Sequence, residues 1–140
     1  MQVRERHLDW SRMKAPPIEE FERIARAAFD ELPEEFRARC ADVVIRVEDF
    51  PDAEVMAEME LDSPFDLLGL YHGVAETHRS VFETTHMPDM VFLYRRPILD
   101  YWTEYDEKLA DIIRHVLIHE IGHHLGFSDD DMHAIERGAS

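Results

Sequence analysis

The segment 106–125 carries apolar side chains at helical spacing, and this repeat constrains the fold more than any other feature of the chain. It predicts an amphipathic helix of about five turns that must bury one face in a hydrophobic core. Gly126 follows directly, at a place where a glycine commonly ends a helix. The apolar positions of the repeat are Leu109, Ile112, Ile113, Val116, Leu117, Ile118, Ile121 and Leu125.

The same segment contains His119, Glu120 and His123 in the spacing H-E-x-x-H. On a helix that turns by about 100° per residue, His123 lies roughly 40° and Glu120 roughly 100° from His119, away from the apolar face. Two imidazoles one turn apart can chelate a zinc ion, and a neighbouring carboxylate can act as a general base. The spacing therefore predicts that His119 and His123 bind the metal and that Glu120 lies beside it without being a ligand.

A third ligand is expected beyond the end of the helix, because a hydrolytic zinc site usually has three protein ligands and one water. Gly126 can adopt the left-handed backbone that turns the chain back, and Asp129 follows three residues later. A chain of this composition has the full run H-E-x-x-H-x-x-G-x-x-D by chance on the order of 0.0002 times. We expect Asp129 to be the third ligand, with Asp130 and Asp131 as the alternatives.

Two further histidines lie on or near this helical stripe. His115 precedes His119 by one turn, and we expect it at the rim of the site, since a fourth imidazole ligand would close the position that water needs. His124 falls towards the packed side of the helix and is expected to be buried and hydrogen-bonded. The remaining histidines, His7, His72, His78, His86 and His133, are scattered and are expected on the surface or in ordinary hydrogen bonds.

The rest of the chain mixes helical and strand-like patterns. Together with the long helix they predict an α+β fold: a small mixed β-sheet packed against helices, with the metal-binding motif on a long C-terminal helix. We expect a loose N-terminal arm over residues 1–16 and a single domain over residues 17–140. Within that domain we expect helices at 17–32, 53–60 and 129–136, strands at 41–47, 67–74 and 90–94, and a surface loop at 75–88.

Composition limits the classes of partner. A formal net charge of −16 repels phosphate backbones and anionic lipids, so neither nucleic acid nor a membrane is an expected partner. Cys40 is the only cysteine, which excludes intramolecular disulfides and thiolate-rich zinc sites. No segment has the ~20 consecutive apolar residues of a membrane span, and the N-terminus has no apolar leader. We expect a cytoplasmic monomer.

The motif is also similar to that of a known protein family. Residues 119–129 resemble the zincin metallopeptidases, and the glycine turn resembles their metzincin branch, with Asp129 where that branch usually has a third histidine. The stretch 94–129 is similar to small bacterial zincin-like proteins with a minimal metalloprotease-type domain, and the likeness spans residues 18–137, including 68–73. It implies a compact α+β fold, a zinc ion and peptidase activity. The chain lacks an obvious metzincin Met-turn, since Met132 follows Asp129 too closely.

These features favour metal-assisted hydrolysis of a peptide or protein substrate, in which Glu120 takes a proton from water and delivers it to the leaving amine. Tyr71, Tyr94 and Arg95 are candidates for stabilising the oxyanion, because they lie on or beside expected strands. Two alternatives remain. One is a metal-dependent hydrolase of a non-peptide substrate, such as the small rRNA-maturation endonucleases, although the negative charge suits RNA badly. The other is a zinc-binding protein without catalytic activity.

Overall fold

The structure is a computed structural model that describes residues 10–40, 42–73 and 89–138. The expected loop at 75–88 and most of the expected N-terminal arm lie outside these residues. The observed elements are the 3-10 helices η1 (Trp10–Arg12) and η2 (Pro64–Asp66), the strands β1 (Val44–Glu48), β2 (Gly69–His72) and β3 (Met90–Tyr94), and the helices α1 (Ile18–Asp30), α2 (Glu34–Ala38), α3 (Ala53–Glu58), α4 (Arg95–Glu104), α5 (Leu109–Leu125) and α6 (Asp129–Gly138).

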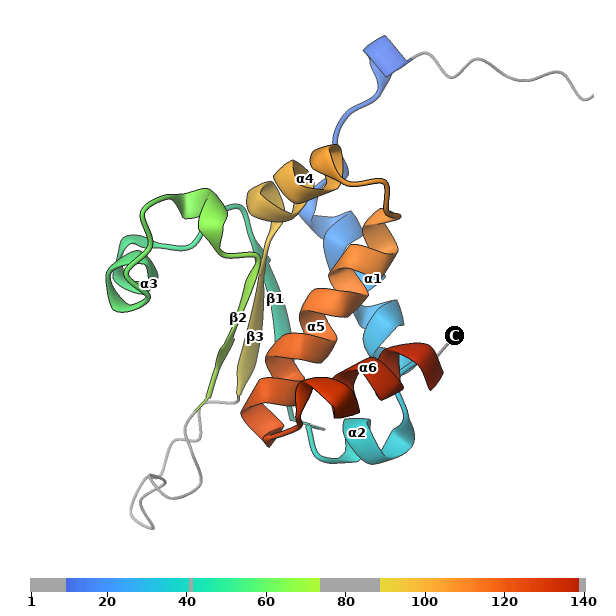
Figure 1. Cartoon of the computed structure of the whole chain (residues 1–140). Helices are drawn as coiled ribbons and strands as arrows, with labels where there is room; N and C mark the ends of the chain where they lie inside the picture. Colours follow the sequence, from blue (N-terminus) through green and yellow to red (C-terminus); the bar gives the residue numbers. More distant parts are fainter. Residues whose placement is uncertain (1–9, 41, 74–88, 139–140) are drawn as a thin grey trace, which may run out of the picture.

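The three strands form one mixed sheet in the order β1-β3-β2, so the expected α+β class is confirmed. β3 lies in the centre, pairs with β1 in parallel and pairs with β2 antiparallel. Along β3 the side chains of Val91 and Leu93 are fully buried, as expected for alternate residues that face the core. Their side of the sheet is covered by helices, since α1 contacts β1 and α5 contacts both β2 and β3 (Figure 1).

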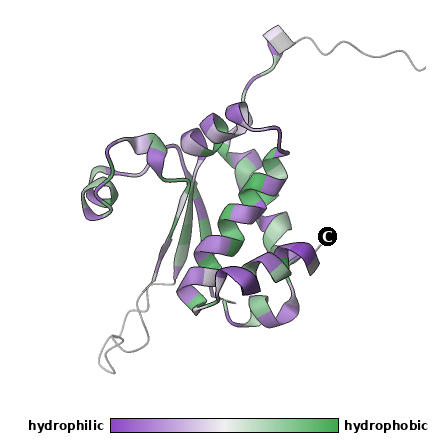
Figure 2. Ribbon diagram, viewed as in Figure 1, coloured by the Kyte–Doolittle hydropathy of each residue, from purple (hydrophilic) through white to green (hydrophobic). Residues whose placement is uncertain are grey.

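The hydrophobic core lies between this sheet and the two longest helices. From α1 it takes Phe21, Ala25, Ala28 and Phe29, at the spacing of one helix face. From α5 it takes Ile112, Ile113, Val116, Leu117, Ile118 and Ile121, six of the eight apolar positions of the repeat, while Leu109 and Leu125 are partly buried against it. Figure 2 shows hydrophobic stretches along α5 and the strands, whereas α6 is mostly hydrophilic. The core therefore fixes α5 through one face and leaves its other face free to carry polar groups.

A glycine turn joins α5 to α6. Gly126 has φ 83° and ψ 18°, and the Phe127 N–H donates to the Gly122 carbonyl at 2.9 Å while the Gly126 N–H donates to that of His123 at 3.1 Å. These two bonds are the Schellman arrangement, which satisfies the last carbonyls of the helix. Ser128 then caps α6 through its hydroxyl, which accepts from the Asp131 N–H at 3.1 Å. The expected end of the long helix at Gly126 is thus confirmed.

Two of the α-helices, α2 and α4, are not among those that the sequence predicts. α2 follows Pro33 directly, so this proline both ends the region of α1 and opens a new short helix. α4 begins at Arg95, although Pro97 suggests a break there. Pro97 occupies the third position of the helix, where a backbone N–H would have no partner within the helix anyway. In the described part of the chain, no helix is long and apolar enough to cross a membrane.

Candidate metal centre

The two histidines of the H-E-x-x-H motif project from the side of α5 that faces away from the core, and Glu120 lies beside β2. The side chain of His119 is 21% exposed and that of His123 is 59% exposed, whereas Ile118 and Ile121 are fully buried. This difference follows from the helical period, since residues three and four apart share one face. The helix therefore presents two imidazoles to solvent-accessible space on a backbone that the core holds in place.

Asp129 meets these histidines after the glycine turn. His119, His123 and Asp129 each offer a ligand atom, and the three atoms all lie within 4.8 Å of one another. The distance from His123 Nε2 to Asp129 Oδ1 is 3.7 Å. Two ligands about 2.05 Å from a tetrahedral zinc ion lie about 3.3 Å apart, so this pair needs only a small inward movement. Two imidazole nitrogens and one carboxylate oxygen are a donor set that suits zinc, and the arrangement fits the ion.

The two rival aspartates are placed differently. The Asp131 carboxylate accepts from the Ser128 N–H at 3.2 Å and so serves the start of α6. Among the described residues, neither Asp130 nor Asp131 belongs to a group whose ligand atoms converge as a metal site requires. The geometry therefore favours Asp129 over its neighbours.

Glu136 also lies at the site, although no pattern in the sequence points to it. Its Oε1 lies 2.8 Å from His119 Nε2 and 2.9 Å from His115 Nδ1, and these three residues also form a group whose ligand atoms converge. Glu136 follows His119 by 17 residues on another helix, so no spacing rule connects them. His115, expected at the rim, is 55% exposed in its side chain and is engaged by this carboxylate.

Comparison with known proteins identifies the family. The sequence profile of the zincin-like metallopeptidases matches residues 40–139. The chain belongs to the zincin-like metallopeptidase family. A solved structure, a conserved hypothetical protein from Thermus thermophilus, matches with a TM-score of 0.54 and 21% identity, over 78% of this chain and 94% of that chain. This second likeness shows the fold alone. None of the curated proteins compared with the chain matches it.

In this zincin-like protein the environment shifts the pKa of two site residues. Burial and the neighbouring His115 lower the pKa of His119, although Glu136 opposes the shift, so the neutral ring that can bind a metal is favoured. Burial raises the pKa of Glu120, while His123 and a backbone hydrogen bond from Tyr71 oppose the shift. A carboxylate with a raised pKa accepts a proton more readily, as a general base at neutral pH requires.

The three oxyanion candidates are committed to other contacts. The Tyr71 hydroxyl donates to Asp89 Oδ2 at 2.9 Å. Tyr94 is 1% exposed, and burial raises its pKa to about 12. The guanidinium of Arg95 donates to the Pro16 carbonyl at 2.7 Å and pairs with Asp49 at 3.1 Å. Tyr71 and Arg95 are thus engaged by other residues and Tyr94 is buried, and an oxyanion role for any of the three stays a prediction.

His124 also differs from its expectation. Its side chain is 29% exposed, so it is not fully buried. Its ring stacks on that of Tyr71, with 3.8 Å between centroids and 13° between planes. Its Nε2 lies 3.7 Å from Asp89 Oδ2, so the ring lies against Tyr71 and this carboxylate at the end of β2 and not in the core.

Proposed function

We propose that this zincin-like protein is a zinc-dependent peptidase in which His119, His123 and Asp129 hold the metal and Glu120 moves the protons. The observation that carries the proposal is the convergence of three ligand atoms within 4.8 Å on the helix that bears Glu120. Zinc held by such a set supplies a Lewis acid and acidifies the water that completes its coordination.

Glu120 is suited to shuttle a proton between water and a leaving amine. It follows the first histidine directly on α5, and burial raises the pKa of its carboxyl. The backbone N–H of Tyr71 binds the carboxylate and orients it. A Cβ added to Gly69 would lie 3.5 Å from Glu120 Cγ, so β2 passes directly beside this side chain. The base is thus fixed between the helix and the neighbouring strand.

The same strand supports a peptide as substrate. β2 lies at one edge of the sheet, and the Tyr94 N–H donates to the Leu68 carbonyl at 2.9 Å in register with the β2–β3 pairing. Since hydrogen-bonded and non-hydrogen-bonded pairs alternate in an antiparallel ladder, the backbone groups of Gly69 and Tyr71 point away from β3. The Tyr71 N–H is already bonded to Glu120, so an extended peptide added to this edge would use the remaining outward groups and pass Glu120.

Other parts of the proposal rest on composition. A net charge of −16 supports a peptide or protein substrate over a nucleic acid or a membrane. We also propose that the protein is a cytoplasmic monomer, because its single cysteine, Cys40, is buried and its negatively charged surface repels other copies.

The test of the base compares the native chain with Glu120→Gln and with Glu104→Gln, a matched change at an exposed site on α4. Zinc content and hydrolysis of a mixed peptide library are measured for each. We expect all three proteins to bind one zinc ion and only Glu120→Gln to lose turnover, by at least about 100-fold, because the proton acceptor is removed. Equal turnover in the native chain and Glu120→Gln would contradict the assignment. Zinc without turnover in the native chain would point to the non-catalytic alternative.

The test of the third ligand compares Asp129→Ala with Asp130→Ala. We expect the first change to weaken zinc binding by at least about 10-fold and the second to leave it unchanged, because only Asp129 converges with the histidines. Isothermal titration of the metal-free proteins with zinc measures both. Equal losses in the two variants would remove Asp129 from the ligand set.

A further inference from the structure

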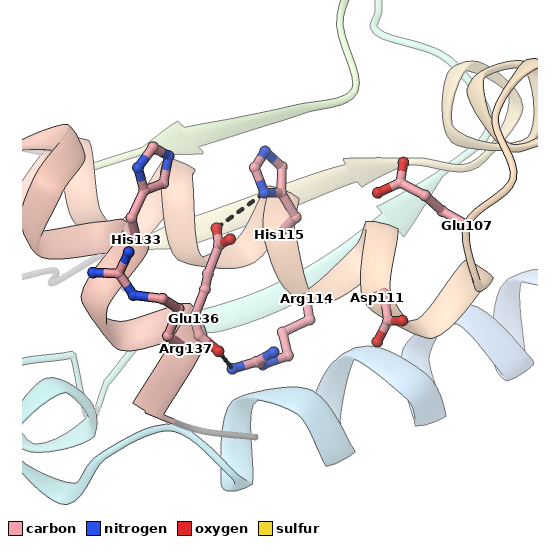
Figure 3. A pocket seen from close by; sticks show the side chains of 7 residues that line it. All are labelled: Glu107, Asp111, Arg114, His115, His133, Glu136 and Arg137. Atoms are coloured by element: carbon pink, nitrogen blue, oxygen red, sulfur yellow. Dashed lines mark hydrogen bonds and ion pairs between the residues drawn. The ribbon is translucent and has the colours of Figure 1, made fainter.

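A second group of ligands lies one helical turn along α5 from the proposed catalytic set. Figure 3 shows His115 from α5 and Glu136 from α6 paired with each other at the wall of a pocket of about 410 Å³. The Glu136 carboxylate oxygen Oε1 is 2.9 Å from His115 Nδ1 and 2.8 Å from His119 Nε2. The donor set is again two imidazoles and one carboxylate, which suits divalent transition metals.

The distances are close to those of a liganded site. The three ligand atoms all lie within 4.8 Å of one another. Ligands of a tetrahedral zinc ion lie about 3.3 Å apart, so an ion would need the carboxylate oxygen to withdraw from each nitrogen by about 0.5 Å. That movement is small for a glutamate side chain. The adjoining pocket has room for water molecules to complete the coordination.

The backbone holds Glu136 in this position. α6 packs closely on α5, because a Cβ added to Gly122 would lie 2.4 Å from the sulfur of Met132, which is fully buried. Near the end of α6, Arg114 Nη2 donates to the Glu136 carbonyl at 2.9 Å, as Figure 3 also shows. The side chains of Glu136 and His119 are only 25% and 21% exposed. The ligands are therefore already assembled, and little conformational entropy is lost when an ion binds.

We propose that His115, His119 and Glu136 form a second binding site for a divalent transition metal, which shares His119 with the catalytic set. A neutral imidazole has one unprotonated nitrogen, so His119 can bind one ion at a time. The two positions therefore exclude each other. In the described residues no convergent group contains both Glu136 and His123, so the two carboxylates serve different positions. When an ion occupies the second position, His123 and Asp129 lack His119 as the third ligand of their site. The second site stands independently of the proposed peptidase activity, and only the name catalytic set for the first site rests on the proposed function.

The test removes the catalytic ligands and asks whether the full chain still binds a metal. We expect the variant His123→Ala/Asp129→Ala to bind one Co²⁺ per chain, measured by titration calorimetry and by visible absorption of the bound ion. Adding Glu136→Gln should weaken that binding at least about 10-fold, because a direct ligand is lost. Adding Glu107→Gln is the matched control, since Glu107 lines the same pocket outside the ligand group and should have no effect.

Three further measurements separate loss of the second site from loss of folding. Far-UV circular dichroism checks that every variant is folded. The reciprocal variant His115→Ala/Glu136→Gln should bind one ion through the catalytic set, and the native chain should also saturate at one. A folded His123→Ala/Asp129→Ala chain that binds no Co²⁺, or equal losses with Glu136→Gln and Glu107→Gln, would overturn the second site. Two ions per native chain would overturn the mutual exclusion. Turnover is not measured in any of these experiments, so a failure of the peptidase proposal remains separate.

Discussion

Replacing Gly126 by alanine tests how the turn after α5 positions Asp129. Gly126 has φ 83°, in the left-handed region that L-residues other than glycine disfavour by about 1–2 kcal/mol. A Cβ added there meets nothing within 4 Å, so the substitution introduces neither a clash nor a new contact. The perturbation is therefore confined to backbone conformation.

The magnitude follows from two opposing contributions. The left-handed backbone costs alanine about 1–2 kcal/mol in the folded state. Alanine also reduces the conformational entropy of the unfolded chain, which returns about 0.4–1 kcal/mol. The net effect on the free energy of unfolding is a loss of about 1 kcal/mol, or about 4 °C in Tm for a domain of this size. Gly126→Asn is the matched control, because asparagine tolerates the left-handed region better and should lose less.

The assay is urea unfolding of the metal-free chain, followed by zinc titration of the same protein. If the turn keeps its conformation, the loss of about 1 kcal/mol is seen in unfolding. If the turn relaxes instead, Asp129 moves away from the histidines and the same free energy appears as a roughly fivefold loss of zinc affinity. Unchanged stability together with unchanged zinc affinity, or an asparagine variant as impaired as the alanine variant, would refute this reasoning.

The remaining predictions concern two core positions, Gly122 and Cys40. Gly122→Ala should lower the free energy of unfolding by about 1 kcal/mol, because the overlap with Met132 costs about 1–3 kcal/mol and the gain in helix propensity returns at most about 1 kcal/mol. Met132→Ala in the same background should then cost less than it does in the native chain, as a double-mutant cycle in urea would show. Burial raises the pKa of the Cys40 thiol to about 11, so at pH 8 a disulfide reagent should react far more slowly with the native chain than with the urea-unfolded chain. The folded state holds this proton more tightly than the unfolded state, so the contribution of Cys40 to stability should fall as pH rises from about 9 to about 11. Rapid labelling of folded protein would contradict the burial of this thiol.

Local sequence signals were sufficient for α5 and its end. The apolar repeat predicts which residues are buried, and the structure buries Ile113, Leu117 and Ile121 completely. Gly126 takes the left-handed conformation expected of it. Helix periodicity and the left-handed turn depend only on residues close together in the sequence, so a single segment is enough to predict them. The β-branched run within residues 41–47 likewise predicts the first strand, which the structure places at Val44–Glu48.

Other elements depended on context that one segment does not carry. Pro97 suggests a break, yet α4 runs through it, because a proline in the first turn removes no helical hydrogen bond. Tyr71, Tyr94 and Arg95 are oxyanion candidates because they lie on or beside strands, but in the structure Tyr71 bonds to Asp89, Tyr94 is buried in the core and Arg95 pairs with Asp49. Which neighbours a strand residue meets is decided by packing between elements, and the sequence pattern does not contain that information.

The sequence by itself determined the helix that bears His119, Glu120 and His123, because their relative directions follow from the helical period. Only the tertiary structure decided what faces them. The close approach of Met132 to Gly122 sets α6 against α5, and this contact brings Glu136 to 2.8 Å from His119. The result is two carboxylates, Asp129 and Glu136, that converge on the same imidazole from residues 10 and 17 positions later in the chain. The glycine turn makes Asp129 predictable from its spacing, whereas no local rule links Glu136 to His119, since the distance between those two residues is fixed by how α5 and α6 pack.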